Sequence, residues 1–126
     1  MKELVIYVHG KGGEAEETEH YKPLFPKSDV IGFDYKSQNP WKAKNEFSDF
    51  YDLNTKGYDS VILIANSIGA FFSMNALAKK TISKALFISP FFLFVLKWAI
   101  PISGLPIHSA NYAIFSCLHR FLHQLM

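Results

Sequence analysis

A serine stands between an apolar run and a helix-forming run in residues 62–77, which read ILIANSIGAFFSMNAL. Small residues flank Ser67, with Ala65 two positions before it and Gly69 two positions after it. A strand that turns sharply into a helix needs small side chains there, because larger ones would collide with the neighbouring strand and helix. Such a turn strains the serine backbone and points the hydroxyl outward above the sheet. The pattern predicts that Ser67 is a nucleophile.

A glycine-rich loop near the start of the chain consists of His9, Gly10, Lys11, Gly12 and Gly13. Acyl transfer requires two backbone N–H groups that converge on the developing negative oxygen. A tight turn after a strand adjacent to that of Ser67 would bring one such amide close to the serine, and glycines permit the turn. The amide of Ile68 faces the same space from the other side.

The paired motifs HGxGG and AxSxG resemble the α/β-hydrolase superfamily, most closely its small, lidless lipase and esterase-type members. The resemblance covers residues 1–90. It implies that Ser67 is the nucleophile and that the main-chain amides of Lys11 and Ile68 are the oxyanion donors, whereas His9 belongs to the loop motif and is not the base. It further implies hydrolysis of a small-molecule carboxylic ester through an acyl-serine, without a metal or organic cofactor.

The elements that must position these residues alternate in the way expected of a parallel sheet covered by helices. Strands are predicted at residues 4–8, 30–33, 61–64 and 85–88, and helices at 15–24, from Pro40 to just before Gly57, and at 68–78. We expect a three-layer α/β/α fold with a mostly parallel sheet of about four strands, a partial α/β-hydrolase fold. The family's strand order would place the third strand beside the first, with the second and fourth outside them. The helix that begins at Pro40 carries an apolar stripe formed by Trp41, Phe47, Phe50 and Tyr51.

The partners of the serine are harder to find in this chain. A serine hydroxyl attacks poorly until a histidine takes its proton and a carboxylate orients that histidine, and in α/β-hydrolases both follow the serine. No Asp or Glu follows Ser67. Asp34 is the only carboxylate at the correct edge of the sheet, but it should lie two strands away. His108 is the candidate base, while His119 and His123 indicate a solvated helix face rather than metal ligands.

Other interpretations stay open beside a serine hydrolase. In one of them, Ser67 caps an ordinary helix in a non-hydrolytic Rossmann-like domain. In another, the glycine-rich loop is a phosphate-binding turn, although it lacks the full nucleotide-binding patterns. In a third, the chain keeps the hydrolase fold but is a non-catalytic truncated remnant, or a module that binds a small molecule or a partner.

The chain of 126 residues is predicted to form one domain, with the hydrolase-like part at residues 1–90 and an apolar tail at 91–126. All eleven acidic residues lie between Glu3 and Asp59, and regular alternation is lost after Pro90. We therefore expect that the native sequence was interrupted near Pro90 by a frameshift or premature stop. The competing expectation is a minimal protein whose tail docks on a membrane or a partner, or self-associates.

Composition narrows the partners and the cellular setting. The net charge of +2 gives no basic surplus of the kind that nucleic-acid binding requires. Cys117 is the single cysteine, and the apolar run before His9 is too short for a signal-peptide core. Proline and glycine interrupt the apolar part of the tail, which disfavours a membrane span. We expect a cytoplasmic protein without a nucleic-acid partner or a metal site.

Overall fold

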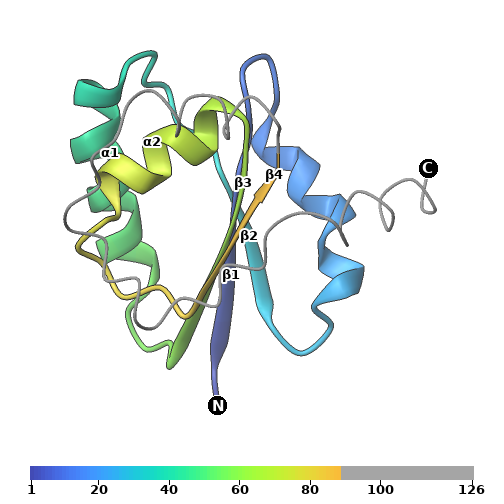
Figure 1. The fold of residues 1–126 in the computed structure, drawn as a ribbon. Helices are drawn as coiled ribbons and strands as arrows, with labels where there is room; N and C mark the ends of the chain where they lie inside the picture. Colours follow the sequence, from blue (N-terminus) through green and yellow to red (C-terminus); the bar gives the residue numbers. More distant parts are fainter. Residues whose placement is uncertain (89–126) are drawn as a thin grey trace.

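The structure is a computed structural model that describes residues 1–88 (Figure 1). The candidate base His108, the pair His119 and His123, and the predicted apolar tail at residues 91–126 lie outside the described residues.

A single parallel sheet of four strands forms the centre of the described chain (Figure 1). Its strands are β1 (Glu3–Val8), β2 (Asp29–Phe33), β3 (Ser60–Asn66) and β4 (Lys84–Ile88). Their order is β2-β1-β3-β4, which confirms the α/β class and the predicted strand order. Val8 is in register with Phe33 of β2 and with Ala65 of β3. The carboxyl ends of these three strands therefore meet at one edge of the sheet.

Two α-helices cover one face of the sheet, α1 (Pro40–Asn54) and α2 (Ile68–Ala76) (Figure 1). Asn39 caps α1 by accepting a hydrogen bond from the Lys42 amide at 3.0 Å, and Pro40 occupies the first turn, where its missing N–H costs nothing. The helix buries Ala43, Phe47 and Tyr51 against the sheet. Trp41 was expected on the apolar stripe but is 80% exposed, because it lies in the first turn, away from the buried face.

The opposite face of the sheet is covered by two short 3₁₀ helices, η1 (Ala15–His20) and η2 (Lys22–Leu24). The prediction of one helix over residues 15–24 is therefore wrong in its type. Pro23 has no N–H to donate to the preceding turn, and it disfavours the α conformation of the residue before it. A close backbone contact also holds the segment down, since a β-carbon on Gly32 would lie 2.2 Å from the carbonyl oxygen of Ala15.

Alternate residues of the strands fill two separate cores. Leu4, Ile6 and Val8 of β1 face α1 and α2, while Val5 and Tyr7 face the 3₁₀ helices. This alternation follows from the two-residue period of a strand, and it buries the central strands on both faces. The structure is thus layered on both sides of the sheet, as predicted.

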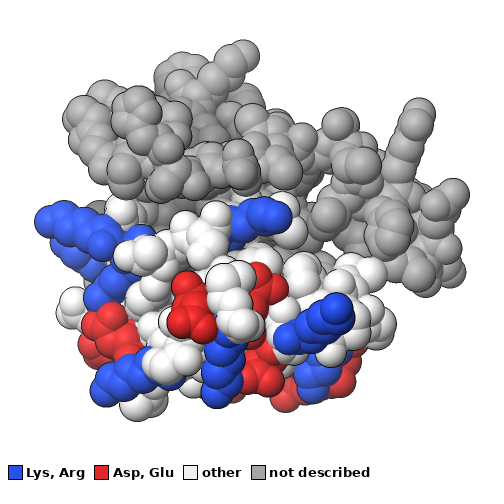
Figure 2. Space-filling view, turned by 90° about the horizontal axis from the view of Figure 1, so that it is seen from below, with Lys and Arg blue, Asp and Glu red and all other residues white. Residues whose placement is uncertain are grey.

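The end of the molecule that holds the amino ends of the strands mixes positive and negative side chains (Figure 2). No helix within residues 1–88 has the length and apolar character needed to cross a membrane.

Candidate functional site

The backbone of Ser67 forms the sharp turn between β3 and α2. Its φ of 53° and ψ of −121° make it the only residue other than glycine with a positive φ within residues 1–88. Conformations of this kind cost about 1–3 kcal/mol and persist only where the surroundings enforce them. Here the Ser67 amide donates to the carbonyl oxygen of Ile88 in β4 at 2.9 Å, and the Ala70 amide donates to the Ser67 carbonyl oxygen at 3.1 Å. The structure has the strained turn that the sequence predicted.

The side chain of Ser67 is half-buried and makes no helix-capping hydrogen bond, although the residue occupies the N-cap position of α2. Its Oγ has no hydrogen-bond partner among the described residues. An ordinary N-cap serine accepts a hydrogen bond from the first turn of its helix. The interpretation of Ser67 as a plain helix cap is therefore not supported by the described residues.

Small residues pack the turn against the glycine-rich loop, as the motif requires. Ala65 is fully buried, and a β-carbon on Gly69 would lie 2.3 Å from the carbonyl oxygen of His9. A β-carbon on Gly10 would lie 3.1 Å from the Cβ of Ser67. Larger side chains at Gly69 or Gly10 would push the loop away from the serine. The structure thus brings the loop and Ser67 together.

Hydrogen bonds fix the shape of the loop. Its turn closes through the Gly13 amide, which donates to the Gly10 carbonyl oxygen at 3.1 Å, and Gly12 has a φ of +75°. The same oxygen lies 2.8 Å from His9 Nδ1, which must carry the proton because a carbonyl only accepts. The other ring nitrogen, Nε2, is buried and has no partner among the described residues. At the far end of the loop, Glu17 Oε1 accepts a hydrogen bond from the Glu14 amide at 2.9 Å and lies so close to Gly13 that a β-carbon there would be 2.5 Å from it.

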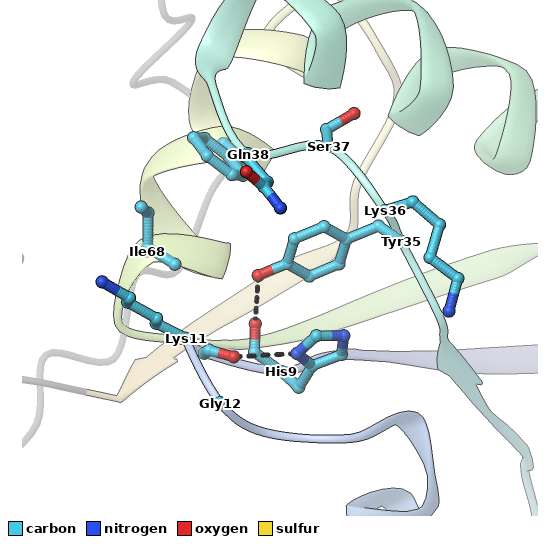
Figure 3. A pocket seen from close by; sticks show the side chains of 10 residues that line it. His9, Lys11, Gly12, Tyr35, Lys36, Ser37, Gln38 and Ile68 are labelled. Carbon is cyan, nitrogen blue, oxygen red and sulfur yellow. Dashed lines mark hydrogen bonds between the residues drawn. The ribbon is translucent and has the colours of Figure 1, made fainter.

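Tyr35 contacts the loop from the neighbouring strand end. Its hydroxyl donates to the His9 carbonyl oxygen at 2.8 Å, and its ring stacks on the imidazole of His9 with 4.3 Å between the centroids (Figure 3). Burial, and next the negative charge of Glu46, raise the pKa of Tyr35 to about 12. The hydroxyl therefore remains a hydrogen-bond donor at neutral pH.

The amides of Lys11 and Ile68, which the resemblance assigns to the oxyanion hole, donate to no acceptor within residues 1–88. Ile68 opens α2, and the first amides of a helix have no partner inside it. The positive end of the helix dipole favours negative charge at that place. Both amides therefore have the hydrogen-bonding capacity that an oxyanion requires.

A partly open cavity of about 490 Å³ lies beside the loop and the start of α2 (Figure 3). The described residues that line it are His9, Gly10, Lys11, Gly12, Tyr35, Lys36, Ser37, Gln38, Ile68 and Phe72. Ser67 is not among them, but its neighbours Gly10 and Ile68 are. These lining residues include two lysines and no acidic side chain. The volume of the cavity suits a small molecule.

One wall of the cavity was not predicted from the sequence, namely the segment from Tyr35 to Gln38 between β2 and α1. Glu46 of α1 holds this wall by accepting hydrogen bonds from the amides of Lys36 at 2.6 Å and Ser37 at 2.9 Å, and from the Ser37 hydroxyl. The signal was present in the strand order, since polar and aromatic residues directly after β2 must reach the same sheet edge as the loop after β1.

Asp34 lies at the end of β2, two strands from β3, as expected. Its Oδ2 accepts a hydrogen bond from Lys36 Nζ at 2.9 Å, and its side chain is 65% exposed. That hydrogen bond, together with the charges of Lys36 and His9, lowers the pKa of the Asp34 carboxyl. Asp34 is therefore engaged with a lysine at the rim.

The surroundings of the loop also bear on metal and phosphate binding. Within residues 1–88, no group of three or more His, Cys, Asp or Glu side chains is placed to hold a metal ion. The loop leads into η1, whose first turn carries Glu16 and Glu17. Phosphate is bound at helix N-termini whose amides are free and whose charge is positive. These two carboxylates make a phosphate-binding turn a poor interpretation of this loop.

Comparison with known proteins gives one distant relationship. No model of a known protein family matches the chain. The chain is 28% identical over 102 residues to a protein of Mycoplasma genitalium named "Putative esterase/lipase 3". The match includes 71% of this chain but spans only 37% of the relative's length. This similarity supports an esterase/lipase-like relationship.

Proposed function

We propose that this chain is a serine hydrolase of the α/β-hydrolase fold, in which Ser67 attacks the carbonyl carbon of a small carboxylic ester. The observation that carries the proposal is the backbone of Ser67, held at a φ of 53° with its hydroxyl unbonded, beside the loop that contains Gly10. The similarity to a protein named as an esterase/lipase supports the same reaction class.

The proposed reaction proceeds in two stages. Ser67 Oγ adds to the ester carbonyl and loses its proton to a base, and the carbonyl oxygen becomes an oxyanion that accepts hydrogen bonds from the amides of Lys11 and Ile68. Collapse of this intermediate expels the alcohol, which takes up that proton, and leaves an acyl-serine. Water then releases the acid by the same steps. The proposed base is His108, and the proposed setting is the cytoplasm.

A second candidate function is a non-catalytic module that binds a small molecule in the same cavity. It is favoured by the composition of residues 68–126, which include no Asp or Glu that could orient a histidine. His9 does not contact Ser67 as a base, since its Nδ1 is engaged with the Gly10 carbonyl oxygen and its buried Nε2 has no hydrogen-bond partner among the described residues.

A fluorophosphonate probe separates the two candidates, because it reacts with activated serines. We expect the full-length protein to be labelled, the Ser67→Ala variant to remain unlabelled, and a Ser48→Ala control on α1 to be labelled like the wild type. Loss of p-nitrophenyl acetate hydrolysis in Ser67→Ala would support the same conclusion. If the folded wild-type protein takes up no label, the hydrolase proposal is wrong and the binding module is favoured.

A further inference from the structure

We propose that Tyr35 is a positioning residue of the candidate site, which fixes His9 and thereby sets the direction of the Lys11 amide. The inference rests on the proposed function, because it concerns one of the two proposed oxyanion donors. Tyr35 follows β2 and Ser67 follows β3, and β1 lies between these two strands in the sheet. Tyr35 therefore acts on the site through the glycine-rich loop that follows β1.

The first step concerns the peptide planes of the loop. Peptide groups are planar and every described peptide is trans, so each N–H points opposite to the preceding C=O. The direction of the Lys11 amide is therefore set by the Gly10 carbonyl. That carbonyl is held by two donors, the Gly13 amide and His9 Nδ1. Rotation of the His9 ring, or of the peptide group between His9 and Gly10, would therefore change the direction of the Gly10 carbonyl and of the Lys11 amide.

The second step shows that Tyr35 controls His9 in two ways. The Tyr35 hydroxyl donates the only hydrogen bond that the buried His9 carbonyl oxygen receives from the described residues. The Tyr35 ring lies nearly parallel to the imidazole, with an interplanar angle of 13° (Figure 3). One side chain thus holds both the main chain of His9 and the ring that donates to Gly10.

The third step concerns the rigidity of Tyr35 itself. Tyr35 is only 7% exposed, and its ring makes edge contacts with Phe47 at 5.0 Å and Phe72 at 6.0 Å between centroids. Aromatic packing of this kind restricts a ring to one orientation. The hydroxyl is therefore presented to the loop from a fixed position, which a flexible surface side chain would not achieve.

Two matched variants test the role. Tyr35→Phe keeps the ring and its stacking but removes the hydroxyl. Tyr51→Phe is the control, because its hydroxyl also donates to a main-chain carbonyl oxygen, that of Thr81, which precedes β4 at the opposite edge of the sheet from the loop. Both lose one tyrosine-to-carbonyl hydrogen bond, so a general loss of stability would affect them alike.

The first measurement is the rate of fluorophosphonate labelling. Removal of one oxyanion donor typically slows catalysis about 10²–10³-fold, and a misdirected donor should cost less. We expect the maximal labelling rate to fall about tenfold in Tyr35→Phe, with the probe concentration for half-maximal rate unchanged, and to stay at the wild-type value in Tyr51→Phe. Equal rates in Tyr35→Phe and wild type would overturn the inference.

The second measurement does not depend on activity. Backbone ¹⁵N relaxation of the folded full-length proteins should show increased motion at Gly10 and Lys11 in Tyr35→Phe only. If the wild type takes up no label, the hydrolase proposal fails, and relaxation alone decides whether Tyr35 holds the loop. A loop as rigid in Tyr35→Phe as in Tyr51→Phe would overturn the inference in either case.

Discussion

A β-carbon on Gly69 would lie 2.3 Å from the carbonyl oxygen of His9, so the first turn of α2 packs directly on the loop that follows β1. This contact joins the two segments that carry the proposed chemistry, one from each of two neighbouring strands. Because β1 and β3 are paired in register up to Val8 and Ala65, the segments leave the sheet at the same level.

Gly69→Ala should therefore destabilise the protein by overpacking this contact. The new methyl group must displace the main chain at His9, directly after β1, and overpacking of this kind costs about 1–3 kcal/mol. Gly57→Ala is the control for backbone strain without overpacking, since its φ of +83° disfavours alanine but no atom lies within 4 Å of a β-carbon there. Urea unfolding should show a clear loss for Gly69→Ala, and fluorophosphonate labelling should be lost in that variant but kept in Gly57→Ala. Wild-type stability in Gly69→Ala would contradict the packing argument.

The strained backbone of Ser67 predicts a gain in stability when the serine is replaced by glycine. Glycine adopts a positive φ without the steric cost that other residues carry, so Ser67→Gly should be about 1 kcal/mol more stable than Ser67→Ala in urea unfolding. The same pair of substitutions at Ser48, inside α1, should show the reverse order, because glycine disfavours helices. A Ser67→Gly variant less stable than Ser67→Ala would show that the turn is not strained.

Asp34 should be dispensable for serine reactivity. Its carboxylate is exposed, pairs with Lys36 and lies two strands from β3, so it is badly placed to orient a base near Ser67. We expect Asp34→Asn to label within about twofold of the wild-type rate. A labelling rate tenfold slower in Asp34→Asn would instead identify Asp34 as the catalytic acid.

Glu46 should matter for binding of the probe, because it holds the cavity wall through the amides of Lys36 and Ser37. Glu46→Gln should raise the probe concentration needed for half-maximal labelling.

Much of this site could be predicted because its parts obey local rules. Ala65, Ser67 and Gly69 stand at the spacing that a strand-to-helix turn imposes, and the strand order places the glycine-rich loop beside them. These features depend on sterics within a few residues, which the sequence displays directly. Their geometry is present in the structure, whereas the catalytic roles of Ser67, Lys11 and Ile68 stay predictions.

Tyr35 could not be predicted in the same way, since its contact with His9 joins residues far apart in the chain. Only the side-by-side exits of β1 and β2 bring them together, and neither residue carries a local signal of the contact. The prediction of one helix over residues 15–24 was wrong for another reason. Their composition favours a helix, but Pro23 and the close approach to Gly32 select 3₁₀ turns instead.

The raised pKa of Tyr35 predicts a distinct alkaline behaviour. Burial and Glu46 hold its pKa at about 12, whereas an unfolded tyrosine titrates near 10. The neutral hydroxyl therefore contributes stability that is fully present below pH 10 and is lost as the pH rises toward 12. A spectrophotometric difference titration between wild type and Tyr35→Phe should show one tyrosine ionising near pH 12, and Glu46→Gln should lower that pKa because a negative charge is removed. Ionisation of Tyr35 near pH 10 in the folded protein would mean that its hydroxyl is solvated rather than bonded to His9.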